Sequence, residues 1–138
     1  MQILRKPPTT KAPAETFTGD AWVDTVVRGE EPSRIRVAIV RFAPAARNAW
    51  HVRAMGQTVH VTEGVGRIQA RGRPLVEMRP GDTVHTPAGE WHWHGAAPDH
   101  FMTHLAMWEA PAGGGPETEW GEKVSDAEYM AAPGGPAR

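Results

Sequence analysis

The chain alternates apolar and polar residues over short segments, which is the pattern of half-buried β-strands. In residues 34–42, the charged Arg34 and Arg36 alternate with Ile35 and Val37, and the residues that follow are apolar on both faces. This segment is therefore predicted to be a strand that becomes buried along its length. Similar segments predict further strands at 20–27, 57–63, 66–70, 75–79, 82–86, 91–95 and 100–108.

Turn-forming residues separate these segments. Gly, Pro and Asp cluster at 71–74, 79–82 and 97–99, where they supply the backbone conformations and hydrogen bonds that turns require. Many short strands in one chain of 138 residues are typical of an antiparallel β-barrel or jelly-roll sandwich, because such folds limit exposed sheet edges. The sequence thus predicts a single all-β domain.

The two ends of the chain lack this alternation. Residues 1–16 are predicted to be an N-terminal extension, 17–110 the barrel, and 111–138 a tail that begins with a Gly/Pro linker. Ser125 and Glu128 have the spacing of a capping box, in which each residue satisfies a backbone N–H of the other. A short C-terminal helix near 125–131 is expected, and residues 133–138 are expected to be frayed.

Composition and charge narrow the function classes. The 15 Lys and Arg nearly balance the 16 Asp and Glu, so no long-range field favours nucleic acid or an anionic membrane. No segment approaches the roughly 18 apolar residues of a membrane span, and residues 1–11 lack the apolar run of a secretory signal. We expect a cytoplasmic protein that acts on a small molecule. Without cysteine, the available metal ligands are His, Gln and carboxylates.

Strand parity sorts the polar residues between the two faces of the barrel, because residues two apart share a face. His51, Arg53 and Gln57 fall on one face, and His60 falls on the other. His92 and His94 share a face, as do Met102, His104 and Trp108 in the last strand. The predicted interior holds His51, Gln57, His92, His94 and His104, with Ala38, Val40, Met102 and Trp108 as apolar lining.

Two spaced motifs contain most of these residues. In the first, Ala45 precedes His51 by five intervening residues, Arg53 follows two positions later, and Gln57 and Gly64 come next. In the second, Gly81, Pro87, Gly89 and His92 follow one another at fixed intervals, with Ala96 four positions further on.

These spacings resemble the two motifs of the cupin superfamily, G-x5-H-x-H followed by E and G, and G-x5-P-x-G-x2-H-x3-N. The chain has Ala45, Arg53, Gln57 and Ala96 where those motifs have Gly, His, Glu and Asn. More narrowly, the stretches 49–51, 56–58, 61–66, 79–82, 92–98 and 102–106 are similar to small bacterial cupins that include manganese-dependent (R)-hydroxynitrile lyases. The resemblance extends from about residue 17 to residue 129.

The resemblance implies a cupin β-barrel that holds one divalent metal ion through His51, Gln57 and His92. It also implies a lyase, with manganese as the metal, although a metal-dependent dioxygenase or isomerase would use the same ligands. Nitrogen and amide-oxygen ligands equally suit Fe, Co, Ni or Zn. His94 is expected to orient a ligand or bind substrate. His104 is either a general base or a buried structural imidazole.

Arg53 occupies the position of the missing metal ligand. A guanidinium is always charged and has donors only, so it cannot ligate a metal. The side chain either swings out to form a surface salt bridge, which is commoner for arginine, or stays inside and binds a carboxylate or phosphate with two hydrogen bonds. The first alternative is slightly favoured. The second would suit a non-catalytic cupin that binds a small acidic ligand.

A second apolar face remains outside the barrel. Trp91 and Trp93 point away from His92 and His94, and Phe101, Leu105 and Met107 point away from His104. Exposed apolar patches of this kind are usually covered. The N-terminal strand or a twofold partner could cover this one, and a homodimer is expected. His60, His85 and His100 are interpreted as surface or packing residues.

Overall fold

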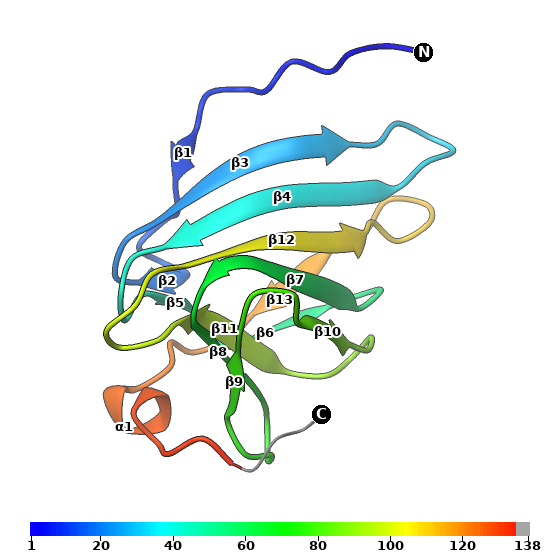
Figure 1. Cartoon of the computed structure of the whole chain (residues 1–138). Helices are drawn as coiled ribbons and strands as arrows, with labels where there is room; N and C mark the ends of the chain where they lie inside the picture. Colours follow the sequence, from blue (N-terminus) through cyan, green and yellow to red (C-terminus); the bar gives the residue numbers. More distant parts are fainter. Residues whose placement is uncertain (135–138) are drawn as a thin grey trace.

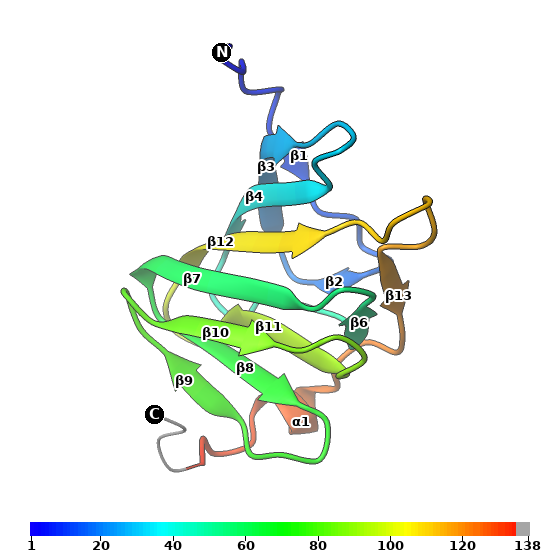
Figure 2. The ribbon, with the colours of Figure 1, turned by 90° about the vertical axis from the view of Figure 1, so that its right-hand side faces the viewer.

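A computed structural model describes residues 1–134, and in it two curled antiparallel sheets face each other with a short helix at one end (Figures 1 and 2). The all-β prediction with a short C-terminal helix is confirmed. The elements are β1 (Thr10–Lys11), β2 (Phe17–Thr18), β3 (Ala21–Arg28), β4 (Ile35–Phe42), β5 (Arg47–Asn48), β6 (His51–Arg53), β7 (Gln57–Gly64), β8 (Gly66–Ala70), β9 (Val76–Met78), β10 (Thr83–Thr86), β11 (His92–Ala96), β12 (Met102–Glu109), β13 (Thr118–Trp120) and α1 (Asp126–Tyr129).

The strand order places the long strands in one sheet. The first sheet has the order β1-β3-β4-β12-β7-β10. The second has the order β13-β6-β11-β5-β2, with β8 paired to β11 and β9 paired to β8. The pairings among the described residues are antiparallel. In the second sheet β6 pairs with β11 through His51 and His92, so these two strands lie side by side opposite the first sheet (Figure 2).

Each predicted strand corresponds to an observed strand, with ends that differ by two residues at most. Five short strands, β1, β2, β5, β6 and β13, were not predicted. Segments of two or three residues are too short for an alternating pattern, and their pairing depends on a distant partner strand. Two of them alter the expected ends of the barrel, because β1 pairs with β3 and β13 pairs with β6.

The main core lies between the inner faces of the two sheets. Val59 of β7, Ala106 of β12 and Ala38 of β4 stand side by side in the pairing register, and each is at most 5% exposed. Small side chains at these positions leave space inside the barrel. At the end of β7 the chain turns through Gly64, whose φ of 79° and close approach to the carbonyl of Phe101 exclude a larger residue.

A second apolar cluster covers the outer face of β11. Trp93 is fully buried there, with Leu75 and Trp50 beside it. Tyr129 packs against the Trp93 ring at a centroid distance of 5.8 Å. Tyr129 belongs to α1, which lies at the lower left in Figure 1. The expectation that the N-terminal strand or a partner chain covers this tryptophan is wrong, because the tail covers it. Phe101 is 50% exposed, and a homodimer stays a prediction.

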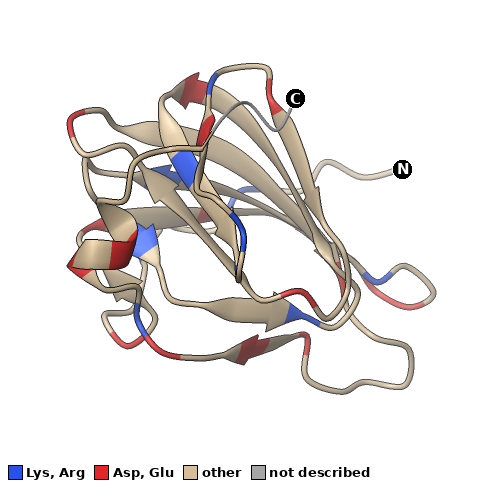
Figure 3. Ribbon diagram, turned by 90° about the horizontal axis from the view of Figure 1, so that it is seen from below, with Lys and Arg blue, Asp and Glu red and all other residues tan. Residues whose placement is uncertain are grey.

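The capping box predicted for the helix is confirmed. The Ser125 side chain accepts a hydrogen bond from the Glu128 backbone, and the Glu128 side chain accepts one from the Ser125 backbone. The acidic residues of the first turn are red in Figure 3, and elsewhere in that view acidic and basic segments are interspersed. Part of the predicted frayed end, 135–138, lies outside the described residues.

No helix among the described residues has the length and apolar character needed to cross a membrane. This agrees with the absence of a long apolar segment in the sequence.

Replacing Tyr129 with phenylalanine is expected to lower the free energy of unfolding by about 1.5 kcal/mol. The Tyr129 hydroxyl donates a 2.6 Å hydrogen bond to the carbonyl of Ala96, at a buried site. Phenylalanine keeps the ring against Trp93 but leaves that carbonyl without its donor. Urea unfolding of the two proteins measures the difference. An unchanged unfolding midpoint would show that the helix end does not hold the sheet in this way.

Candidate metal centre

Three buried imidazoles converge between β6 and β11. His51 begins β6 and pairs directly with His92 in β11, and His94 follows on the same face two residues later. One ring nitrogen from each lies within 4.8 Å of the others. The exposed fraction of each residue is 2% or less. The sequence predicted His51 and His92 as metal ligands, and the structure adds His94 to the same cluster.

Gln57, the first residue of β7, completes the cluster from the opposite sheet. Its side-chain oxygen Oε1 lies 3.3 Å from Nε2 of His51, 3.1 Å from Nε2 of His92 and 3.4 Å from Nε2 of His94. One oxygen and three nitrogens therefore surround one small volume.

Hydrogen bonding on the far side of two rings shows that this cluster fits a cation. Nδ1 of His51 lies 2.8 Å from the carbonyl oxygen of Ala49, and Nδ1 of His92 lies 3.2 Å from that of Glu90. Carbonyl oxygens only accept, so each Nδ1 carries the proton and each neutral ring presents a bare lone pair at Nε2.

The amide oxygen of Gln57 faces these lone pairs with lone pairs of its own, and its Nε2 has no hydrogen-bond partner among the described residues. A half-turn of the amide group would remove this conflict. A cation bound between the facing lone pairs would also remove it. Three imidazole nitrogens and an amide oxygen suit Mn, Fe, Co, Ni or Zn. The residues present therefore fit a divalent metal.

Burial keeps these imidazoles neutral, as metal ligation requires. Desolvation lowers the pKa of His51 and of His94 well below the usual value, and neighbouring histidines and Arg53 lower both further. Desolvation also lowers the pKa of His92 to about 4 and that of His104 to about 4.

The metal-free protein is expected to lose stability as the pH falls from 6.5 to about 4, because the pKa values of His92 and His104 drop from 6.5 to about 4 on folding. In that range the unfolded chain binds protons that the folded chain does not, so acid favours unfolding. This contribution is fully present above pH 6.5. Urea unfolding of chelator-treated protein across the range measures it. A constant free energy of unfolding would contradict the prediction.

His104 lies behind His94 rather than at the open site. Nε2 of His104 is 3.0 Å from Nδ1 of His94, and the residue is fully buried. The ring of Phe42 packs against it at a centroid distance of 5.3 Å. The predicted general base therefore contacts the site through His94. Asn48 also holds this segment, because its side-chain oxygen accepts a 2.9 Å hydrogen bond from the His94 backbone.

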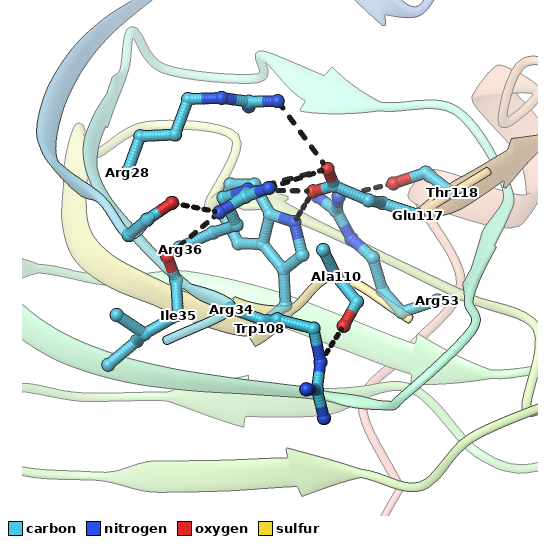
Figure 4. A network of polar contacts seen from close by, with 10 residues as sticks. Arg28, Arg34, Ile35, Arg36, Arg53, Trp108, Ala110, Glu117 and Thr118 are labelled. Atoms are coloured by element: carbon cyan, nitrogen blue, oxygen red, sulfur yellow. Dashed lines mark hydrogen bonds and ion pairs between the residues drawn. The ribbon is translucent and has the colours of Figure 1, made fainter. Parts of the chain in front are cut away.

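Arg53 stays at the barrel mouth and does not form the surface salt bridge that the sequence slightly favoured. Its guanidinium carbon lies 4.3 Å from the centre of the Trp108 ring, and Nη1 donates to the hydroxyl of Thr118 in β13 (Figure 4). Burial lowers its pKa to about 10, against the opposing influence of Glu117. The side chain remains a cation near neutral pH, and it does not contribute a lone pair to the cluster.

A cavity of about 160 Å³ opens beside the cluster. Ala38, Val40 and Trp108, three of the predicted apolar lining residues, border it together with Arg53. Met102 does not: it is fully buried at the other end of β12, against Gly66. The complete lining is Phe17, Val23, Ala38, Val40, Phe42, Asn48, Arg53, Gln57, His94, Ala106, Trp108 and Trp120.

The contribution of β13 to this cavity was not predicted from the sequence. The Trp120 ring lies 4.8 Å from the His51 ring and also contacts Phe17, which is 6.4 Å away between ring centres. The sequence offered one indication of this contribution, which is that Trp120 is the only tryptophan in the predicted tail. Thr118 and Glu117, which contact Arg53 and Trp108, lie in the same segment.

The other three histidines lie away from the cluster, as expected. His60 contacts the Thr83 hydroxyl at 2.8 Å, His85 contacts that of Thr58 at 2.9 Å, and His100 pairs with Asp99 at 2.8 Å.

Comparison with known proteins gives a family match and a similar curated protein. Residues 38–107 match the family model described as a cupin domain. The chain is 44% identical over 119 residues to a protein named (R)-mandelonitrile lyase from Granulicella tundricola, a match that covers 86% of this chain and 89% of that protein.

Solved structures agree with the family match. A cupin-like protein from Thermotoga maritima has a TM-score of 0.83 and 36% identity, with 98% of this chain and 99% of that chain covered. A cupin-2 domain from Rhodospirillum rubrum has a TM-score of 0.69 and 17% identity, with 88% and 77% covered, and supports the fold alone. The chain belongs to the cupin family.

Proposed function

We propose that this cupin is a metal-dependent lyase that cleaves cyanohydrins of small aldehydes, of which mandelonitrile is an aromatic example. The observation that supports this proposal best is the arrangement of the cluster. The Nε2 lone pairs of His51 and His92 converge with the Gln57 oxygen beside a cavity with aromatic walls. The name of the 44% identical relative supports the reaction type. The sequence resemblance to manganese-dependent enzymes of this kind supports manganese as the metal.

His51, Gln57 and His92 would hold the metal. When bound, a divalent cation supplies Lewis acidity that favours the anionic form of a substrate oxygen. Of the three clustered histidines, only His94 borders the cavity, among the described residues. We therefore assign His51 and His92 to ligation and His94 to contact with the substrate.

The reaction requires one proton to move twice. His94 Nε2 takes the proton of the cyanohydrin hydroxyl, the oxygen forms the aldehyde C=O bond, and the bond to the nitrile carbon breaks with its electron pair on cyanide. The cyanide then takes the proton and leaves as hydrogen cyanide. His104 is a positioning residue in this scheme. With the His94 proton on Nδ1, Nε2 of His104, 3.0 Å away, would accept a hydrogen bond from it and stabilise the imidazolium.

The aromatic residues of the cavity would hold the organic part of the substrate. Trp108 and Trp120 approach from different sheets, and Phe17 lies between Trp120 and Phe42. Ring faces of this kind bind aryl groups and exclude water from the reacting atoms.

The test is metal analysis and turnover with protein purified without chelators or nickel resin. We expect stoichiometric divalent metal and release of benzaldehyde from mandelonitrile, followed by its ultraviolet absorbance. The His94→Ala variant should keep its metal and lose activity by roughly 10²- to 10⁴-fold. Metal-free, inactive protein after growth in manganese would contradict the proposal, as would unchanged turnover in His94→Ala.

A further inference from the structure

Three arginines gather near the carboxylate of Glu117, and one of them, Arg53, lines the cavity (Figure 4). Arg28 and Arg36 both contact the carboxylate of Glu117, at 3.7 Å and 3.2 Å, and Arg53 lies close to them in Figure 4. The indole Nε1 of Trp108 also donates to Glu117 at 2.8 Å. Glu117 therefore contacts Arg28, Arg36 and the Trp108 indole. No hydrogen bond or ion pair joins it to Arg53 among the described residues.

Arg53 has no ion-pair partner among the described residues. Nη1 donates to the Thr118 hydroxyl, and Nε is buried without a hydrogen-bond partner in the described part of the chain. No hydrogen bond from Nη2 is found there either. The edge formed by Nε and Nη2 is the edge of a guanidinium that accepts a planar carboxylate with two parallel hydrogen bonds.

The surroundings hold this edge in place. The Trp108 ring supports one face of the guanidinium, and Thr118 fixes one end. Partial burial desolvates this cation, and the nearby Glu117 offsets the cost only in part, since the pKa of Arg53 is still lowered to about 10. An arginine fixed by its neighbours at a cavity wall, with a free fork and no carboxylate, has the features of an anion-binding residue.

We propose that Arg53 binds a carboxylate group of the substrate, so that the substrate is a small anionic hydroxy compound. The inference rests on the proposed function, because it assigns a second group of the molecule whose hydroxyl contacts His94. Arg53 and His51 are two residues apart in β6, or about 7 Å along a strand. The carboxylate therefore lies a few bonds from the reacting oxygen.

A carboxylate fits better than phosphate. The cavity is about 160 Å³ and has mostly apolar walls, including Ala38, Val40 and Ala106. One free guanidinium edge matches the two oxygens of a carboxylate, whereas a phosphate dianion would leave further oxygens against apolar side chains.

The test compares benzoate with benzamide, which has the same shape and no charge, by isothermal titration calorimetry at fixed ionic strength. We expect benzoate to bind at least tenfold more tightly than benzamide, and Arg53→Met to remove that preference. Arg53→Lys should retain part of it, because it keeps the charge and loses the fork. Arg28→Met is the matched control: it removes an equal charge from the same network at an exposed position and should change benzoate affinity less than twofold.

Equal affinities for benzoate and benzamide would overturn the proposal. So would equal losses in Arg53→Met and Arg28→Met, or tighter binding of inorganic phosphate than of benzoate. Circular dichroism of each variant checks folding, and Arg53→Lys provides the comparison if Arg53→Met unfolds.

The titration is run on metal-free and manganese-loaded protein, so that the two proposals are separated. Benzoate binding that depends on Arg53 supports this inference even if mandelonitrile is not cleaved. Cleavage of mandelonitrile without that dependence supports the lyase and overturns the carboxylate site.

Discussion

Replacing His92 with alanine is expected to remove bound metal and to lower mandelonitrile cleavage by roughly 100-fold or more, since loss of a residue that merely supports a ligand already costs about 10- to 100-fold. Nε2 of His92 lies 3.1 Å from the Gln57 oxygen, the shortest of the three imidazole contacts to that atom. His92 also pairs with His51 across the two strands. Removing the His92 side chain therefore removes the candidate ligand that lies nearest to the Gln57 oxygen.

The matched control is His85→Ala. His85 is exposed on β10, its ring nitrogen contacts the hydroxyl of Thr58, and it lies away from the histidine cluster, so this variant should keep both metal and activity. Metal content by mass spectrometry and benzaldehyde release are measured together. A His92→Ala protein that is folded and retains its metal would show that the cation is bound elsewhere. His92→Gln, which keeps a polar side chain, replaces it if alanine prevents folding.

The fold could largely be predicted because its long strands carry their own pattern. In β4, for example, Ala38, Val40 and Phe42 are buried and alternate with more exposed residues, so the strand has one buried face and does not become buried on both faces as the sequence indicated. The short strands could not be predicted in this way. Thr118–Trp120 becomes a strand because it pairs with β6, more than 60 residues earlier in the chain. No local property of three residues specifies such a partner.

The motif spacing predicted which residues are candidate metal ligands, but it did not predict the distances between their side chains. Ala45 illustrates this: it stands where the cupin motif has glycine and adopts a φ of 69°, in the region that favours glycine. The backbone of the motif is therefore retained without its usual residue. Parity placed His94 on the same face as His92, but the distances to Gln57 depend on how the two sheets approach each other.

The orientation of Arg53 depended on residues far along the chain. Trp108 and Thr118 hold the guanidinium at the cavity, and they belong to β12 and β13. From the sequence, exposure was the commoner expectation for an arginine in a strand. The same limit applies to Trp93, whose cover is supplied by Tyr129 of the tail.

Replacing Arg53 with histidine is expected to raise the affinity for Mn²⁺ by about 10- to 100-fold. The charge of Arg53 already reaches the cluster, because it lowers the pKa of His51, His92 and His94. Histidine removes this repulsion and adds an imidazole two residues from His51, on the same side of β6. Calorimetric titration of metal-free protein with Mn²⁺ measures the gain.

Two further variants divide this gain into its causes. Arg53→Met removes the positive charge without adding a ligand, so its affinity should lie between those of the wild type and Arg53→His. Arg53→Lys keeps the charge and adds no ligand near neutral pH, so its affinity should stay close to that of the wild type. If Arg53→His and Arg53→Met bind Mn²⁺ equally well, the side chain at position 53 does not reach the ion, and only its charge has governed the affinity of the site.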